Sequence, residues 1–321
     1  RNSIIQETIF NFILKIKEEV MNVSYKSTMK TGFIGWVYTP PKELGLREPM
    51  DIVKWQIDKS EELGCTVFQP GFPCPEDDDS LKYLRDYAGS KNIELEFRAP
   101  YEIFSAAGPN AAEAAAAIKE GIRKGKLIGA NILRTGYGRF HIDTTRFSKN
   151  IPVKQHLETL ANNLKEAAKI FEDEGVYCAI ENHCDFTGKE WAEVFAAVGS
   201  PYIGCALDTG NGYTVYCDPN EDVEVLAEYT ITTHIKDMAV IPYDSKGDLI
   251  PFQARGVVLG EGNVDIPRTI DILDQKCPHA NGLHLVLELG WANYVDDVPR
   301  DIQNRELTEK CLVYLHDLLK K

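Results

Sequence analysis

Three carboxylates and one imidazole each come at the end of a short apolar segment of this sequence. The segments are "VYCAIENH", "IGCALDTG", "ITTHIKD" and "LHLVLELG", and the residues are Glu181, Asp208, His234 and Glu288. Carboxylates bind hard cations and imidazole binds cations of intermediate character, so the four donors together suit one divalent ion. We predict such a site, with Mn²⁺ as the first choice and Mg²⁺, Co²⁺ or Zn²⁺ as alternatives.

Each of these residues taken alone has a simpler explanation as a solvated loop residue or a helix cap. The four taken together do not, because three carboxylates that meet at one point repel one another unless a cation neutralises them. The combination therefore favours a metal site over four unrelated surface groups.

The four apolar segments belong to a longer alternation of strand-like and helix-like segments. Strands are expected at 31–38, 65–70, 93–99, 130–136, 176–183, 203–210, 231–237 and 283–290. Helices are expected at 51–64, 77–88, 110–128, 153–174, 189–198, 266–276 and 306–319. Alternating elements imply parallel strands, and eight repeats favour a closed (β/α)₈ TIM barrel over an open doubly wound sheet. Active sites of this fold lie at the C-terminal ends of the strands, which is where the four residues fall.

The length of 321 residues suits one such barrel, and we expect a single catalytic domain over residues 29–321. The connection from Met238 to Asn263 lacks clear periodicity and is expected to be a loop over the barrel mouth. Residues 1–28 have the pattern of an amphipathic helix, too short and too often interrupted by polar residues to span a membrane. This extension packs on the barrel or on a partner, or it is not native, since the chain opens with Arg1.

Composition excludes several classes of partner. The net charge of -14 opposes binding to a phosphate backbone, so no nucleic acid is expected. The eight cysteines form no C-x-x-C pair, which indicates reduced thiols in a cytoplasmic protein rather than a zinc ribbon or a redox motif. We expect a small-molecule substrate, no membrane partner, and a homo-oligomer or a complex with a small partner subunit.

The motifs "AIENH", "ALDTGN", "THIKD", "LGEGNVD" and "LVLELG" resemble those of the xylose-isomerase-like superfamily of TIM barrels, the sugar phosphate isomerase/epimerase family. The resemblance extends from about Met29 to the C-terminus. It implies that Glu181, Asp208, His234 and Glu288 bind the metal. It also implies that the two glutamates act as acid and base on opposite faces of a bound sugar.

The chemistry expected of such a site is proton abstraction beside a carbonyl. A divalent cation that holds a carbonyl oxygen and the adjacent hydroxyl makes the C–H between them acidic, and a base then forms a metal-held enediolate. Glu181 and Glu288 have the position of that base, whereas His183 and His141 have the titration range. His183 follows Glu181 by two residues and would face the same side of a continued strand, where we expect it to contact a substrate hydroxyl. His141 is either a base or an ordinary loop histidine.

Four further residues are expected to contact the substrate, and most have a structural alternative. Lys236, with Asp237 beside it, would bind substrate oxygens or form an ion pair at the barrel rim. Arg255 would reach an anionic or hydroxyl-rich substrate or remain a solvated loop charge. Trp36 and Trp291 lie at strand ends, where an aromatic face can stack on a sugar, although Trp36 also suits the core.

The leading function is a metal-dependent sugar isomerase or epimerase. A lyase is the close rival, because dehydratases of keto-inositols and C-glycoside deglycosidase α-subunits acting on 3-oxo-glycosides resemble the same superfamily and begin with the same enediolate. A C-glycoside lyase would need a small β-subunit. A non-catalytic sugar-binding or scaffold subunit is the alternative of another class. A DNA-repair endonuclease fits less well, because the second and third predicted strands supply no additional histidine ligand.

Overall fold

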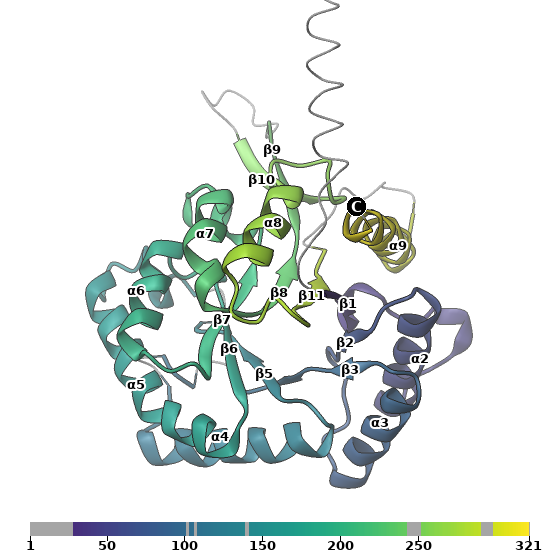
Figure 1. Cartoon of the computed structure of the whole chain (residues 1–321), viewed down its shortest axis with the longest axis horizontal. Helices are drawn as coiled ribbons and strands as arrows, with labels where there is room; N and C mark the ends of the chain where they lie inside the picture. The colour runs from purple at the N-terminus through teal and green to yellow at the C-terminus, as the bar shows by residue number, and fades with distance from the viewer. Residues whose placement is uncertain are drawn as a thin grey trace, which may run out of the picture.

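A computed structural model describes residues 28–100, 103–105, 108–138, 141–242, 252–289 and 298–320. The amphipathic extension predicted over residues 1–28 lies outside the described residues, apart from Thr28. Within the described part, parallel strands form the centre of the molecule and helices surround them (Figure 1).

The parallel strands close into a barrel. Their order is β3-β2-β1-β11-β8-β7-β6-β5-β4. The two strands at the ends of this order, β3 and β4, are separated in the chain only by Glu96, so they are two halves of one barrel strand. The predicted (β/α)₈ TIM barrel is therefore confirmed. The strand bounds are β1 (Lys30–Ile34), β2 (Val67–Gln69), β3 (Glu94–Leu95), β4 (Phe97–Arg98), β5 (Ile132–Thr135), β6 (Tyr177–Glu181), β7 (Ile203–Asp208), β8 (Thr230–Ile235) and β11 (His284–Leu287).

Eight described α-helices cover the outside of the barrel (Figure 1). They are α2 (Pro49–Glu62), α3 (Asp78–Ser90), α4 (Ala111–Leu127), α5 (Val153–Glu174), α6 (Gly188–Val198), α7 (Pro219–Leu226), α8 (Ile266–Lys276) and α9 (Arg300–Leu319). Short 3₁₀ turns lie at η1 (Gly35–Val37), η2 (Lys42–Leu44), η3 (Ile142–Thr144), η4 (Asn211–Val215) and η5 (Ala227–Tyr229). Helix α7 was not predicted, and α9 begins before the predicted residue 306.

The main hydrophobic core lies between the strands and these helices. Fully buried aromatic residues come from both layers, among them Phe33 and Phe68 from the strands and Phe171 and Trp191 from the helices. Burying each such side chain contributes about 1.5–3 kcal/mol relative to leaving it in water. Backbones also approach closely, since a Cβ added at Gly32 would lie 2.1 Å from the carbonyl oxygen of Val67. This packing fixes the depth of the residues at the strand ends.

The connection after β8 is not the loop that the sequence predicts. It contains β9 (Asp237–Pro242) and β10 (Phe252–Val257), which pair as an antiparallel hairpin, so the prediction of an unstructured connection is wrong for these residues. The Asp237 carboxylate accepts hydrogen bonds from the backbone amides of Gly260 and Gly262, both at 2.9 Å, and of Val264 at 3.1 Å. These bonds fasten the base of the hairpin to the end of β8.

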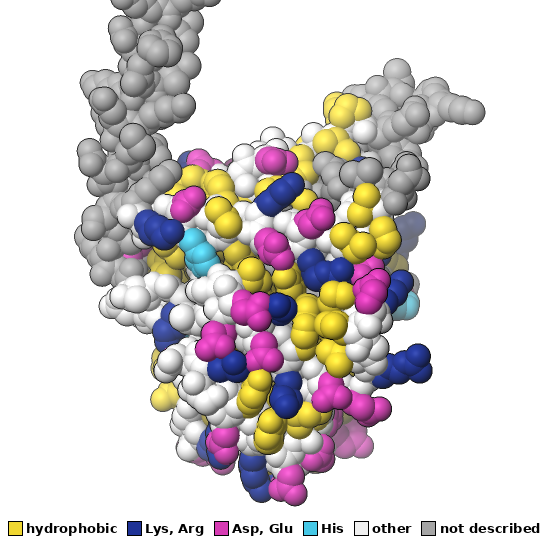
Figure 2. Space-filling view, turned by 90° about the vertical axis from the view of Figure 1, so that its right-hand side faces the viewer, with side chains coloured by type: hydrophobic (Ala, Val, Ile, Leu, Met, Phe, Trp, Pro, Cys, Tyr) yellow, Lys and Arg dark blue, Asp and Glu magenta, His cyan; other side chains and the backbone are white. Residues whose placement is uncertain are grey.

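The surface carries mixed charge. On the face shown in Figure 2, Lys and Arg side chains are interspersed with Asp and Glu. Lys91, for example, lies 3.0 Å from Asp58 and 2.6 Å from Glu61. All eight cysteines are free thiols. Among the helices of the described residues, none has the length and apolarity needed to cross a membrane.

Candidate metal centre

The structure brings the four predicted ligands together at the C-terminal end of the barrel. Glu181 and Asp208 are the last residues of β6 and β7, His234 lies near the end of β8, and Glu288 directly follows β11. These four strands are consecutive neighbours in the barrel. One ligand-type atom from each side chain lies within 4.8 Å of the corresponding atoms of the other three.

His234 lies between the two glutamates. Its Nδ1 atom is 3.6 Å from Glu181 Oε1 and 3.4 Å from Glu288 Oε2. This Nδ1 atom and Asp208 Oδ2 are buried and have no hydrogen-bond partner. Buried polar atoms are nearly always paired, so two unpaired atoms within one cluster of metal-ligand types indicate room for an additional cation. The donors present therefore fit a divalent ion held by the four side chains.

In each of the three carboxylates, the oxygen that faces away from the centre of the cluster accepts hydrogen bonds from neighbouring groups. Arg134 Nη1 donates to Glu181 Oε2 at 2.7 Å, and Trp36 Nε1 donates to Glu288 Oε1 at 3.3 Å. The backbone amides of Gly210 and Asn211 donate to Asp208 Oδ1 at 2.8 and 3.0 Å. Each carboxylate thus keeps one oxygen for the centre of the cluster, which is the arrangement that surrounding hydrogen bonds give to metal ligands.

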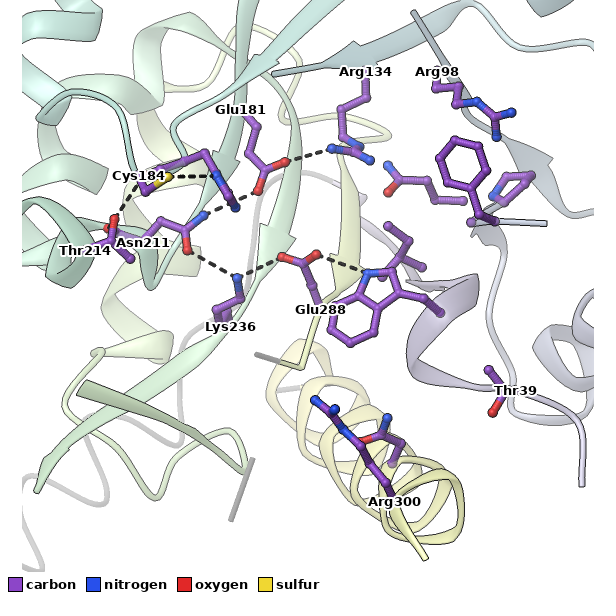
Figure 3. A pocket seen from close by; sticks show the side chains of 18 of the residues that line it. Thr39, Arg98, Arg134, Glu181, Cys184, Asn211, Thr214, Lys236, Glu288 and Arg300 are labelled. Atoms are coloured by element: carbon purple, nitrogen blue, oxygen red, sulfur yellow. Dashed lines mark hydrogen bonds and ion pairs between the residues drawn. The ribbon is translucent and has the colours of Figure 1, made fainter. Parts of the chain in front are cut away.

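Lys236 is a second cation in contact with this cluster, besides Arg134. Its Nζ atom lies 2.7 Å from Asp208 Oδ2, 2.8 Å from Glu288 Oε2 and 3.3 Å from Asn211 Oδ1. In Figure 3 the ammonium points between Asn211 and Glu288. Asp208 Oδ2 therefore has an ion pair with Lys236 although it accepts no hydrogen bond. The ammonium therefore neutralises part of the carboxylate charge.

The pKa values show how strongly these charges interact. Burial alone would lower the pKa of His234, but the two glutamates outweigh burial and raise it to about 9. Burial would raise the pKa of Glu181, yet the His234 charge lowers it to about 2. For Asp208, burial outweighs the attraction of Lys236 and raises the pKa to about 7, whereas the pKa of Lys236 is raised by its carboxylate neighbours despite burial. Protons on His234 and Lys236 thus supply positive charge that the carboxylates require.

The cluster borders a cavity of about 1130 Å³, which Glu181 and Glu288 line. Aromatic and apolar side chains line part of it, including Trp36 and Phe72. Arg98 also lines the cavity, with its guanidinium carbon 3.8 Å from the centre of the Phe72 ring. Asn304, near the start of α9, lines it as well. A volume of this size holds a small ligand with several polar groups.

Of the other residues that the sequence predicts as catalytic or substrate-binding, some line the cavity and some do not. Lys236, Trp36 and His183 line the cavity, and His183 Nδ1 lies 3.4 Å from Cys184 Sγ. His141 is exposed and is not among the lining residues. Arg255 is half-buried on β10, paired with Ala239, and does not line the cavity either. Trp291 lies outside the described residues.

The structure adds site residues that the sequence analysis did not identify. Arg134 is a cation inside the apolar strand β5, and Asn211 donates to Glu181 Oε1 at 3.3 Å. A charged residue within a buried strand of four residues is costly unless it has a partner. The presence of Arg134 in such a strand is the one feature that indicates a role for it. Gln69 and Arg98, at the ends of β2 and β4, also line the cavity.

Comparisons with known proteins agree with this architecture. The sequence profile described as "Xylose isomerase-like TIM barrel" matches residues 33–308. The 3-oxo-isoapionate decarboxylase of Pectobacterium atrosepticum is 26% identical over 133 residues, which are 40% of this chain and 46% of that relative, so the match spans less than half of its length.

Solved structures show the same fold. D-psicose 3-epimerase with D-tagatose, from Clostridium cellulolyticum H10, superposes with a TM-score of 0.63 at 15% identity, covering 91% of this chain and 99% of the other. IOLI protein with a binding zinc atom superposes with a TM-score of 0.65 at 16% identity, covering 91% and 98%.

Proposed function

Since the chain belongs to the xylose isomerase-like TIM-barrel family, we propose that it is a divalent-metal-dependent enzyme that abstracts a proton beside the carbonyl of a sugar and acts as an isomerase or epimerase. The observation that carries this proposal is the convergence of Glu181, Asp208, His234 and Glu288 within 4.8 Å beside a cavity of about 1130 Å³, with two of their buried atoms lacking a hydrogen bond. Mn²⁺ remains our first choice of ion. The epimerase and zinc-containing relatives support the choice of reaction and of cofactor class.

The proposed proton transfer uses the two glutamates. A divalent ion bound here would supply Lewis acidity at a carbonyl oxygen and its neighbouring hydroxyl. Glu288 and Glu181 face His234 Nδ1 from separate strands, so each can meet a ligand at the centre from a different direction. One carboxylate would take the proton from the C–H beside the carbonyl, and the other would return a proton to the resulting enediolate. General bases placed within hydrogen-bond reach contribute roughly 10² to 10⁴ in rate.

The remaining lining residues would bind and orient the sugar. Lys236 has its ammonium inside the cavity and can donate to a substrate oxygen once another cation neutralises Asp208 and Glu288. His183 faces the same cavity. The hydrogen bond from Trp36 Nε1 to Glu288 holds the indole ring in place. A ring held in this way can stack against the face of a sugar.

A lyase is the second candidate, and Lys236 is the observation that favours it. The Lys236 ammonium is held at the proposed reacting centre in addition to the two glutamates, so it can protonate a leaving oxygen, which a lyase needs and a simple epimerase does not. In a decarboxylation, the electrons of the broken C–C bond would form the enediolate, CO₂ would leave, and Lys236 would supply the proton to carbon. The decarboxylase relative supports this class of reaction.

Proton NMR in D₂O distinguishes these reactions. Mn²⁺-loaded protein, then Mg²⁺-exchanged protein to limit line broadening, is incubated with ketoses, keto-inositols, 3-oxo sugar acids and 3-oxo-glycosides. Deuterium beside the carbonyl together with a new sugar is the expected result. Release of water, CO₂ or an aglycone would establish the lyase instead.

The control is the Asp208→Asn variant, which should lose all of these reactions. If the metal-loaded protein gives neither deuterium exchange nor product on the whole panel, the catalytic proposal fails in favour of a sugar-binding or scaffold role. The homo-oligomer or small partner subunit also stays a proposal, which the mass of the purified particle tests.

A further inference from the structure

The ring nitrogen of His234 that faces away from the metal cluster is bound by Gln69. His234 Nε2 lies 2.9 Å from Gln69 Oε1. Both side chains are buried. A neutral imidazole carries one proton, and whichever nitrogen holds it cannot bind a metal. The direction of this one hydrogen bond therefore decides whether Nδ1 is free to be a ligand.

The orientation of the Gln69 amide is set by Glu96. Gln69 Nε2 donates to Glu96 Oε2 at 2.6 Å. An ionised carboxylate only accepts hydrogen bonds, so the amide nitrogen must face Glu96 and the amide oxygen must face His234. It follows that His234 Nε2 is the donor and carries the proton, which leaves Nδ1 for the metal.

Glu96 is in turn held as a carboxylate by donors on its other oxygen. Thr232 donates its hydroxyl to Glu96 Oε1, and His284 Nδ1 donates to the same oxygen at 2.8 Å. The other nitrogen of His284 lies 3.0 Å from Glu94 Oε2. Because both nitrogens of His284 face carboxylates, this ring carries two protons and the charge that Glu96 needs.

We propose that Gln69 and Glu96 are positioning residues that fix the tautomer of His234, with the proton on Nε2 and the lone pair of Nδ1 at the metal. The inference rests on the proposed metal centre. The hydrogen bonds of Glu96 go to Gln69, Thr232 and His284 and to none of the four ligands, so Glu96 acts on the His234 ring through Gln69. Partners of this kind change metal affinity by roughly 10- to 100-fold when they are removed.

The first test is the Zn²⁺ affinity of Glu96→Gln, measured by competition with a chelator. A glutamine at position 96 can donate to the oxygen of Gln69, which lets the Gln69 amide rotate and donate to His234 Nε2. The proton then moves to Nδ1, and we expect Zn²⁺ binding to weaken roughly 10- to 100-fold. Gln69→Leu, which removes the acceptor altogether, should weaken Zn²⁺ binding within the same range.

Thr230→Val is the matched control. Thr230 lies on the same strand as His234 but outside this network. The substitution removes the buried hydrogen bond of 2.9 Å that the Thr230 hydroxyl donates to the Leu226 carbonyl. It should lower the melting temperature without changing the Zn²⁺ affinity. If all three variants weaken Zn²⁺ binding in proportion to their loss of stability, the positioning role is overturned.

Nitrogen-15 NMR of the Zn²⁺-loaded protein reads the tautomer directly. The wild type should show a proton on His234 Nε2 and none on Nδ1, whereas a proton on Nδ1 would contradict the inference. Unaltered Zn²⁺ affinity in both Glu96→Gln and Gln69→Leu would also overturn it. A wild-type chain that binds no divalent ion would instead overturn the metal centre itself, so the two failures are distinguishable.

Discussion

Two clusters of histidine and carboxylate groups in the described part of the barrel differ in how completely their polar atoms are hydrogen-bonded. The mouth cluster is Glu181, Asp208, His234 and Glu288, and the inner cluster is Gln69, Glu96 and His284 with the exposed Glu94 at its edge. In the inner cluster, Glu96 accepts from three side chains and His284 has a carboxylate at each nitrogen. In the mouth cluster, His234 Nδ1 and Asp208 Oδ2 have no hydrogen-bond partner. The same residue types therefore form a complete network in one place and an incomplete one in the other.

We interpret this difference as the physical reason to propose a metal site in the mouth cluster and not in the inner one. A buried charge is tolerated when hydrogen bonds and an opposite charge compensate it, as they do around Glu96. In the mouth cluster, ligand atoms of four residues instead converge within 4.8 Å of one another, and two of these atoms accept or donate no hydrogen bond. In the inner cluster, Glu94 and Glu96 approach opposite nitrogens of His284, so no common point for an ion exists between them.

Removing a base from the mouth cluster should have the largest effect. In Glu288→Gln, we expect the rate of deuterium exchange at saturating metal to fall roughly 10² to 10⁴-fold while substrate still binds, because the general base is lost. Exchange is followed by proton NMR, and binding by calorimetry. Unchanged exchange would transfer the role of base to Glu181 or His183.

Removing His284 from the inner cluster should lower stability, whereas the metal stoichiometry should stay at one. His284→Leu leaves the Glu96 carboxylate buried without its cation, and losing one partner of a buried pair costs about 3–5 kcal/mol. Urea unfolding measures this loss in the free energy of unfolding. The variant should still bind one equivalent of metal, and loss of that metal in folded protein would erase the distinction between the clusters.

The inner cluster also predicts a pH dependence of stability. Burial would lower the pKa of His284, but Glu94 and Glu96 outweigh burial and raise it to about 9. A group whose pKa is raised by folding stabilises the fold fully below its unfolded pKa of about 6.5 and loses that contribution as the pH rises through 9. The free energy of unfolding should therefore fall between these values.

The control for this titration is His284→Gln in metal-loaded protein, where His234 is occupied by the ion. The decline in stability over the alkaline range should be shallower in this variant than in the wild type. Parallel curves for the two proteins would show that His284 does not supply the titration.

The smallest effect is expected outside the barrel. Glu224 pairs with Arg268 and Lys276, each at 2.7 Å, but all three are substantially solvent-exposed. Exposed ion pairs contribute little, so Glu224→Gln should leave the melting temperature and metal content unchanged. A marked loss of stability in Glu224→Gln would mean that ion pairing by itself, and not the burial of the pair, accounts for the contribution of the inner cluster to stability.

The sequence predicted the mouth cluster because each ligand ends an apolar strand. Glu181, Asp208, His234 and Glu288 could be read one at a time, and the barrel fold then implied that they meet. The strands and most helices followed from periodicity in the same way. Helix α7 was missed although Asp218 and Pro219 form a regular helix start, because its eight residues are too few to show periodicity.

The inner cluster could not be predicted in this way. Gln69, Glu96 and His284 lie within or beside strands of two to four residues, and which of them face the barrel interior depends on register. Their pairing joins residues up to 188 positions apart in the chain, which only the closed barrel brings together. The hairpin β9–β10 was missed for a related reason, since its order depends on Asp237 binding a distant loop.

The most direct test of the account is the metal content of purified protein after loading with Mn²⁺ and removal of excess ion. The wild type should retain one equivalent per chain, and Asp208→Asn and His234→Ala should retain none. His284→Leu is the matched control, because it also removes a buried histidine, and it should retain one full equivalent of metal. Retention of a full equivalent by Asp208→Asn or His234→Ala, or no metal in the wild type, would contradict the assignment of the mouth cluster.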